Sequence, residues 1–239
     1  AGGAHVTVCP EEVLSDPYCD YILIGEAEES FRDLLLALIQ NKEINSIDGL
    51  GWKLYGKLCI NPKKKWITDL DSIAFPAYHL MELNKYSGLK RSHGLRHRNK
   101  FSPIITTRGC PAKCTFCSAH RVWGNKYRLR SVDNVITEMK LLKDKYGVEE
   151  LMFEDDNVTA SPKRAKELFS RMIEEKFKFV DHHNCRLGKW YNQGEGKEMF
   201  SKTPSYPKLE TPHATVHNGT HKVFDLIVEE NIDTNALVA

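Results

Sequence analysis

The sequence predicts an α/β fold, in which short apolar strands alternate with amphipathic helices. The apolar run 21–24 is followed by a stretch, 31–39, whose apolar residues recur at helical spacing. The same order of strand and helix occurs twice more between 104 and 173. With 239 residues and 41% hydrophobic content, the chain can bury a core of ordinary size.

The charge balance excludes some classes of partner. Lys plus Arg number 34 and Asp plus Glu 32, so no basic surface indicates nucleic acid or an anionic membrane as a partner. No run of about 18 apolar residues occurs and no secretory signal is visible, so we expect a cytoplasmic protein that does not enter the membrane. The chain opens with Ala1 in the middle of a glycine turn, and we expect upstream residues to be missing.

The first 60 residues should form a small α/β unit. In chain order we expect a turn at Gly2-Gly3, a strand around Val6 and Val8, a short helix from Pro10, the strand 21–24, the helix 31–39 and a hairpin over 47–60. Residues 61–102 have the composition of a linker, because lysines cluster at 63–65 and basic residues at 90–100. We interpret the basic stretch as a solvated connector.

Between 103 and 180 the sequence predicts two β/α units. A strand at 104–107 is followed by a cysteine-containing loop and a helix, and a second strand at 151–153 by a second helix. Ser161 is a suitable N-cap for that second helix, with Pro162 at its first position. The buried faces should comprise Val135, Ile136, Met139, Leu142 and Tyr146 in the first helix and Ala165, Leu168, Phe169, Met172 and Ile173 in the second.

Three of the seven cysteines lie within eight positions, directly after the first of these strands. An odd cysteine count with this spacing suits metal ligation in a reducing compartment better than a disulfide framework. Cys110, Cys114 and Cys117 could hold three corners of an iron-sulfur cube and leave one iron open. The alternative is a structural zinc or cluster site with Cys185 or Cys59 as fourth ligand, but it leaves the strand and the following β/α unit unexplained.

A run of acids, Glu154-Asp155-Asp156, follows the second strand. The carboxyl ends of strands carry the active sites of β/α barrels, so these carboxylates are candidates for ligand binding. An ordinary solvated loop is the alternative. We favour the site, because the strand end, the acids and a capped helix coincide.

The cysteine spacing and Phe116 resemble the radical S-adenosylmethionine superfamily, whose CxxxCxxC motif matches Cys110, Cys114 and Cys117. The resemblance implies that these thiolates hold a 4Fe-4S cluster, and that S-adenosylmethionine chelates the open iron and is cleaved to a 5′-deoxyadenosyl radical. It places Phe116 beside the adenine and the acids 154–156 at the methionine ammonium group. It implies no catalytic residue beyond the cluster ligands, and an electron donor such as flavodoxin or ferredoxin.

Residues 1–60 resemble the last third of a cobalamin-binding domain, on the segments Gly2 to Thr7, 10–14 and 20–28. That resemblance implies a Rossmann-like remnant in which Gly2 and Gly3 approach the nucleotide tail of cobalamin. The cobalt-ligand histidine motif of the family would lie upstream of residue 1. A plain turn is the alternative for the two glycines, and His5 is better explained as a surface or hydrogen-bonded histidine than as a ligand.

The segment 181–239 resembles the chemoreceptor zinc-binding domain, a bacterial helical sensor, on Cys185-Arg186-Leu187-Gly188-Lys189-Trp190 and on His213 with His217. The resemblance implies a zinc ion held by Cys185, His213 and His217. His182 or His221 could supply a fourth ligand, since each lies one helical turn from one of these residues.

Four segments follow: 1–60 as the end of a cobalamin-binding-like domain, 61–102 as a linker, 103–180 as the start of a radical-type β/α barrel, and 181–239 as a partial helical zinc-binding segment. We expect a junction near residue 180. The favoured function is a radical S-adenosylmethionine enzyme, as an incomplete chain, of a methyltransferase-like or ring-forming class acting on a small molecule that the sequence does not specify. The alternative is a zinc-binding sensory module fused to a vestigial enzyme fragment.

Overall fold

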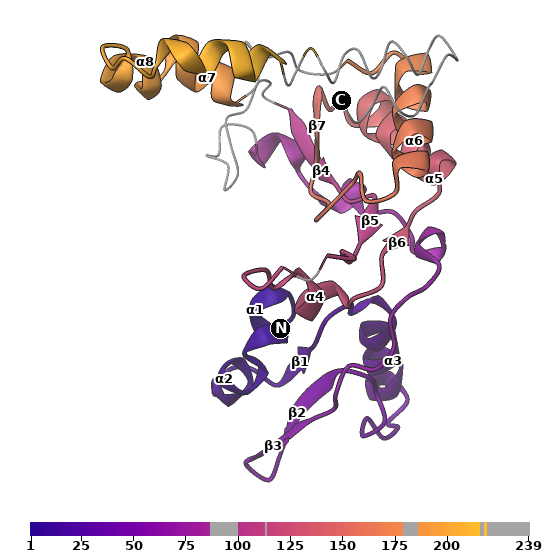
Figure 1. Cartoon of the computed structure of the whole chain (residues 1–239). Helices are drawn as coiled ribbons and strands as arrows, with labels where there is room; N and C mark the ends of the chain where they lie inside the picture. The colour runs from indigo at the N-terminus through magenta and orange to yellow at the C-terminus, as the bar shows by residue number, and fades with distance from the viewer. Residues whose placement is uncertain (87–99, 113, 179–185, 216–217, 219–239) are drawn as a thin grey trace. The chain divides into compact units, whose positions relative to one another are not determined.

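The computed structural model describes residues 1–86, 100–112, 114–178, 186–215 and 218, which form a mixed α/β protein (Figure 1). The chain divides into two compact units. The first comprises Ala1–Phe75, Ile105–Ser131 and Phe153–Ala160, and the second comprises Pro76–Ile104, Val132–Met152 and Ser161–Ala239. Among the helices of the described residues, none combines the length and apolar character that a membrane crossing requires.

The first unit is built around a three-stranded sheet. Its elements are α1 (Ala4–Val8), α2 (Pro10–Ser15), β1 (Tyr21–Leu23), α3 (Glu28–Ile39), β2 (Leu50–Leu54), β3 (Lys57–Ile60), the 3-10 turn η1 (Leu70–Ser72), β5 (Thr107–Arg108), α4 (Ala119–Trp123) and β6 (Arg128–Leu129). β1 and β3 both pair with β2 in antiparallel fashion. The predicted hairpin is confirmed, with Tyr55 and Gly56 at its turn at φ values of 49° and 77°.

The segment around Val6 and Val8 is a helix, so the strand expected there is wrong. The N–H and the hydroxyl of Thr7 both donate to the carbonyl of Gly3, at 3.0 and 2.8 Å. In a strand both valines would face the same side, whereas here Val6 packs with Leu14 and Ile22 while Val8 is exposed. Packing against the sheet therefore outweighs the strand preference of the valines.

Helix α3 forms where its apolar spacing predicts it, but only part of its apolar surface is buried. Leu34 and Ala37 pack against β1 and β2 with Leu23 and Leu50. The other apolar residues of the predicted stripe remain exposed, and they are Phe31, Leu35, Leu38 and Ile39. α3 therefore keeps an open apolar face within this unit.

The second unit contains the helices of both predicted β/α units, whereas the cysteine loop belongs to the first unit. Its elements are η2 (Tyr78–Leu80), η3 (Leu83–Tyr86), β4 (Phe101–Ile104), α5 (Val132–Lys140), the π-helical turn η4 (Leu141–Lys145), β7 (Glu150–Phe153), α6 (Pro162–Glu174), α7 (Arg186–Gln193), α8 (Glu195–Phe200) and η5 (Pro207–Leu209). β4 and β7 are neighbours in a two-stranded sheet. Ser161 is the N-cap of α6 as predicted, although its hydroxyl makes no capping hydrogen bond.

The core of the second unit is formed by the predicted helix faces. Val135, Ile136, Met139 and Leu142 are buried, as are Ala165, Leu168 and Met172 of α6. One polar pair lies among them, because the Tyr78 hydroxyl donates to the buried carboxylate of Glu138 at 2.7 Å. Further along, the Trp190 ring of α7 packs against Phe200 and Tyr206.

Candidate functional site

The three cysteines of the motif lie in one loop between two paired strands. β5 and β6 are antiparallel, with Arg108 opposite Arg128, and the loop spans the residues between them. Cys110 and Cys117 are half-buried and Cys114 is exposed, all as free thiols. The Cys117 N–H donates to the Cys114 carbonyl at 3.2 Å.

In the part of the chain that the structure describes, no three His, Cys, Asp or Glu side chains converge closely enough to hold a metal ion. The chemistry of the donor set nevertheless fits an iron-sulfur cluster. Three thiols in one short loop, two of them half-buried and one exposed, are the ligands that such clusters take.

Glycines fix both ends of this loop. Gly109 has a φ of 79°, and a Cβ there would lie 2.3 Å from the carbonyl oxygen of Lys126. Gly124 has a φ of 74°, and a Cβ there would lie 3.0 Å from the ring of Trp66. A Cβ at Gly25 would lie 3.3 Å from the same ring, so Trp66 lies between two glycines. Only glycine fits these backbone conformations without displacing a neighbour.

The strand predicted at 104–107 is divided at Thr106, whose N–H and hydroxyl donate to an acid while its carbonyl accepts the N–H of Arg130 at 3.0 Å. β4 ends at Ile104 and β5 begins at Thr107. Between them, the N–H and hydroxyl of Thr106 donate to one oxygen of Asp155, at 2.9 and 3.0 Å. The other Asp155 oxygen is buried without a hydrogen-bond partner among the described residues.

The two acids beside Asp155 differ from it in their surroundings. Glu154 and Asp156 are exposed, so their carboxylates are open to a ligand. Partial burial, and then the charge of Asp155, raise the pKa of Asp156 above its ordinary value. Of the three acids predicted from the sequence, one therefore holds the backbone before the cysteine loop and two remain available.

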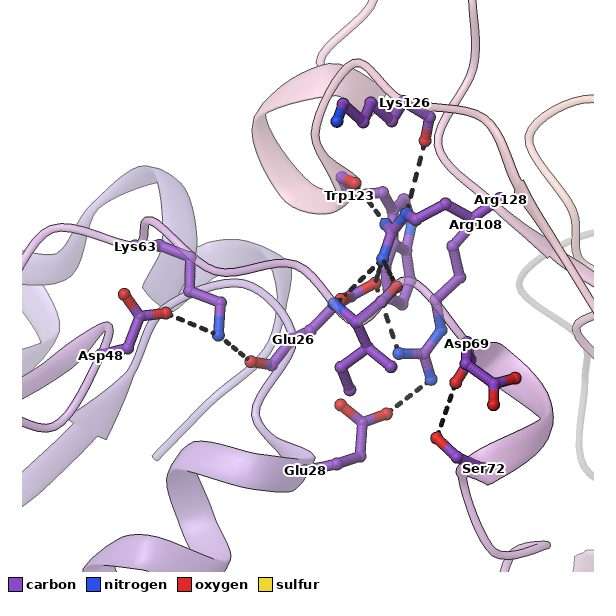
Figure 2. Close-up of polar contacts among 11 residues, drawn as sticks. Glu26, Glu28, Asp48, Lys63, Asp69, Ser72, Arg108, Trp123, Lys126 and Arg128 are labelled. Atoms are coloured by element: carbon purple, nitrogen blue, oxygen red, sulfur yellow. Dashed lines mark hydrogen bonds and ion pairs between the residues drawn. The ribbon is translucent and has the colours of Figure 1, made fainter.

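A buried carboxylate network lies beside the same loop, and sequence reasoning did not single it out (Figure 2). The Glu26 side chain is fully buried, and its two oxygens lie 2.6 and 2.8 Å from Nη1 of Arg128. The Ile67 N–H donates to Glu26 at 2.9 Å, and Nη1 of Arg108 lies 3.4 Å from it. Glu26 follows Gly25, two residues after β1, within the segment 20–28 that resembles a cobalamin-binding domain, and these are the sequence signals that could have indicated it.

The two arginines make further contacts around the helix of the cysteine loop. Arg108 pairs with Glu28 at 2.5 Å and its guanidinium lies 5.1 Å from the ring centre of Trp123. Arg128 donates to the Trp123 carbonyl at 2.6 Å. Burial alone would raise the pKa of Glu28, but the hydrogen bond and charge of Arg108 outweigh it, and the net pKa lies below the ordinary value.

Part of the predicted linker belongs to the first unit and contributes to this network. Lys63, nearly buried, donates to the Glu26 carbonyl at 2.6 Å and lies 3.2 Å from a carboxylate oxygen of Asp48. Asp48 also accepts the N–H groups of Lys64 and Lys65, at 2.8 and 3.2 Å. Burial raises the pKa of Asp48, but these two backbone hydrogen bonds and Lys63 outweigh it and lower the pKa overall.

A hollow of about 860 Å³ lies in the first unit, beside the open face of α3. The residues that line it include Gly2, Trp123, apolar side chains of α3, and Glu26 and Glu28. Gly3, with a φ of 101°, has open space around the position of a Cβ. Of the glycine pair predicted to approach a cofactor, Gly2 lines this apolar hollow. His5 is exposed, which agrees with the surface alternative for this histidine.

Residues 104–207 match the Radical SAM superfamily. The segment that begins just before the cysteine loop is therefore a Radical SAM superfamily domain. The family match continues past residue 180, where we expected a junction.

Several curated relatives are similar to the chain beyond this segment. It is 36% identical over 175 residues to an uncharacterized methyltransferase of Pyrococcus horikoshii, covering 73% of the chain and 36% of the relative. It is 33% identical over 227 residues to cytidylyl-2-hydroxyethylphosphonate methyltransferase of Streptomyces wedmorensis, covering 86% and 42%. An anaerobic magnesium-protoporphyrin IX monomethyl ester cyclase of Rubrivivax gelatinosus is 29% identical over 177 residues, covering 72% and 30%. The chain thus spans less than half the length of each.

Solved structures share the fold. The radical S-adenosylmethionine methyltransferase TsrM from Kitasatospora setae, bound to cobalamin and a [4Fe-4S] cluster, gives a TM-score of 0.53 at 19% identity, covering 73% of this chain and 33% of that one. The cobalamin-dependent radical enzyme OxsB gives 0.57 at 18% identity, covering 75% and 24%. At this identity the likeness concerns the fold alone.

The predicted zinc ligands lie mostly outside the described residues. Cys185, His182, His217 and His221 belong to the parts of the chain that the structure does not describe. His213 is half-buried within the helical residues 210–215. The zinc site therefore stays a prediction. The sensory alternative is not favoured, because the match to the Radical SAM superfamily extends into this segment as far as residue 207.

Proposed function

We propose that this chain holds a 4Fe-4S cluster through Cys110, Cys114 and Cys117 and binds S-adenosylmethionine at it, as part of a methyltransferase-like or ring-forming radical enzyme. The observation that carries the proposal is the single loop that contains all three thiols, within the segment that matches the superfamily. The cluster, when bound, supplies the electron that cleaves a carbon–sulfur bond of S-adenosylmethionine. The protein supplies binding, orientation and exclusion of water.

The residues around the loop have separate roles in this proposal. The thiolates bind iron, and the pair of hydrogen bonds from Thr106 to Asp155 fixes the backbone that leads into the loop. Glu154 and Asp156 offer exposed carboxylates to the ammonium group of S-adenosylmethionine, an arrangement that opposite charge favours. Phe116, whose side chain is 92% exposed, offers an aromatic face to the adenine.

Cobalamin is a second proposed cofactor. The hollow beside Gly2 is lined mainly by apolar side chains, as small-molecule and cofactor sites usually are. Gly3 adopts a backbone conformation that side chains disfavour, and no atom would obstruct a ligand at its Cβ position. We propose that Gly2 and Gly3 contact the nucleotide tail of the cofactor there. The structural neighbours TsrM and OxsB were both solved with cobalamin bound, which supports this assignment.

The relatives support the proposed class of reaction, and the substrate is left open. Two of the relatives are methyltransferases and one is a ring-forming cyclase, which supports either class for the chain. We propose a small-molecule substrate and a flavodoxin or ferredoxin as electron donor. A cytoplasmic location is part of the same proposal, because the cluster needs a reducing compartment.

The test is anaerobic reconstitution with iron and sulfide. The parent chain should take up about four iron atoms per chain, as a cubane cluster requires. Cys114→Ala should lose the cluster, whereas the matched control Cys59→Ala on β3 should keep it. S-adenosylmethionine should change the electron paramagnetic resonance spectrum of the reduced cluster. Unchanged iron content in Cys114→Ala would refute the ligand assignment, and a spectrum insensitive to S-adenosylmethionine would refute the open iron.

Zinc in the last segment is a separate proposal that rests on the sequence. Cys185, His213 and His217, with His182 or His221, would hold it. Titration of the full chain with zinc and a competing chelator, before iron is added, tests it. Cys185→Ala should weaken binding strongly and Cys59→Ala should not, and a parent chain that binds no zinc would remove the proposal.

A further inference from the structure

Two arginines lie opposite each other at the base of the cysteine loop. Arg108 and Arg128 form a pair in the register of β5 and β6, directly before and after the loop. Their side chains are only 15% and 6% exposed. Two positively charged guanidinium groups on paired residues, both shielded from water, repel each other unless a negative group lies between them.

The negative group between them is Glu26, from a distant part of the chain. Its carboxylate contacts both arginines, at 3.4 Å for Arg108 and 2.6 Å for Arg128. Glu28 offers Arg108 a second partner, but that carboxylate is 38% exposed and contacts Arg108 alone. Within the described network, Glu26 is therefore the carboxylate that both arginines share (Figure 2).

Glu26 is itself held on two sides. Its carboxylate accepts the N–H of Ile67, and its carbonyl accepts the side chain of Lys63. Arg128 donates in turn to the carbonyl of Ile67 at 2.7 Å. Because Glu26 is fixed on these sides, it links residues 25–28 and 63–67 to Arg108 and Arg128 at the two ends of the loop.

We propose that Glu26 is a positioning residue for the cysteine loop: through Arg108 and Arg128 it holds both ends of the loop in the conformation that binds the cluster. The proposal rests on the proposed function insofar as the loop binds iron. Among the described residues, the polar contacts of Glu26 are with Arg108, Arg128, Ile67 and Lys63 and not with the three cysteines, so we expect its effect to be on the loop. Without its charge, the two buried arginines lose their shared partner and the loop should open more often.

The first experiment measures how often the cysteine loop opens in the cluster-free chain, so its readout does not depend on iron binding. The thiols are alkylated with iodoacetamide, and each cysteine is followed by mass spectrometry. In Glu26→Gln the half-buried Cys110 and Cys117 should react about fivefold faster or more, because local opening exposes them. Cys59 on β3 is the internal reference and should react at the parent rate.

Two control variants separate positioning from general loss of stability. Glu29→Gln neutralises an exposed acid on the neighbouring helix α3 and should leave every rate unchanged. Leu50→Ala removes a fully buried side chain from the sheet of the first unit, so it should lower the melting temperature without a selective change at Cys110 and Cys117. A third variant, Arg108→Lys, keeps the charge but loses the planar fork, and it should reproduce the Glu26→Gln pattern more weakly.

The second experiment follows cluster loss to a ferrous chelator after reconstitution. Glu26→Gln should lose its cluster several-fold faster than the parent and Glu29→Gln. If the parent takes up no cluster, the proposed function fails and the alkylation pattern still decides the role of Glu26. Equal alkylation of Cys110 and Cys117 in Glu26→Gln and parent would overturn the proposal. A uniform increase that includes Cys59 would also overturn it, because Glu26 would then serve overall stability.

Discussion

Thr106 and Asp155, 49 residues apart, are joined by two hydrogen bonds to a single carboxylate oxygen. Thr106 is fully buried, so its N–H and hydroxyl have no access to water. Asp155 therefore stabilises the backbone immediately before the cysteine loop, a role different from the ligand contact that its place at a strand end predicts. Substitutions at Thr106 and Asp155 therefore test whether Asp155 contributes to the stability of the folded protein.

Asp155→Ala should destabilise the protein more than Thr106→Val. The first change leaves two buried donors unpaired, at roughly 1–3 kcal/mol each, whereas the second removes a donor together with its need for a partner and should cost about 1 kcal/mol. Urea denaturation followed by circular dichroism measures both. Equal effects of the two variants would contradict the structural role of Asp155.

Gly109→Ala should prevent cluster uptake. A methyl group there would lie 2.3 Å from the carbonyl of Lys126, so the loop must move or the strand pair must separate. Gly56→Ala is the matched control, because Gly56 has nearly the same φ, 77° against 79°, with open space around it. The control should cost only about 1 kcal/mol, the backbone penalty alone. Iron content and melting temperature distinguish the two, and normal iron in Gly109→Ala would contradict the prediction.

Stability of the iron-free chain should fall in acid. The pKa values of Asp48 and Glu28 lie below their ordinary values of 3.8 and 4.5 in the folded protein. Their stabilisation is therefore complete above those ordinary values and is lost as pH falls through the lower folded pKa values. Melting temperature should stay level from neutral pH to about pH 5 and then decline. Asp48→Asn should melt lower than the parent at pH 7 and show a shallower decline as pH falls below 3.8, the ordinary pKa of an aspartate.

Asp156→Asn should gain stability and lose affinity for S-adenosylmethionine. Because the pKa of Asp156 is raised, the charged carboxylate costs stability at neutral pH, and this cost disappears as pH falls through the folded pKa. A ligand ammonium group would use the same charge, so its loss should weaken binding roughly tenfold. Melting temperature and equilibrium dialysis measure the two effects. Unchanged binding in Asp156→Asn together with weaker binding in Glu154→Gln would assign the ammonium contact to Glu154.

The sequence predicted the elements whose signals are local. Helices α5 and α6 follow from the spacing of apolar residues, and the hairpin of β2 and β3 from its alternating pattern around Gly56. The cysteine loop follows from ligand spacing, which depends on residues close together in the chain. The strand expected around Val6 was wrong, because the packing of that valine on Leu14 and Ile22 is set by the folded unit.

The network of Glu26 could not be predicted in the same way. Arg128 lies 102 residues after Glu26, so no local pattern relates them. The composition of 61–102 suggests a linker because lysines usually face water, yet Lys63 is held by Asp48 and by the Glu26 carbonyl. Isolated charged residues carry little information about their burial until their partners are known.

The position of Trp66 between Gly25 and Gly124 has an evolutionary consequence. Side chains at these three positions would compete for the same space, since a Cβ would lie 3.3 Å from the indole ring at Gly25 and 3.0 Å from it at Gly124. A smaller residue at 66 would remove that steric conflict, but the φ values of 67° and 74° would still disfavour a side chain at either glycine. Among proteins that share an ancestor with this chain, we therefore expect the residues allowed at 25 and 124 to depend on the size of residue 66, and not the reverse. Position 66 can shrink while both glycines persist, whereas a side chain at 25 or 124 should occur only where 66 is already smaller than tryptophan.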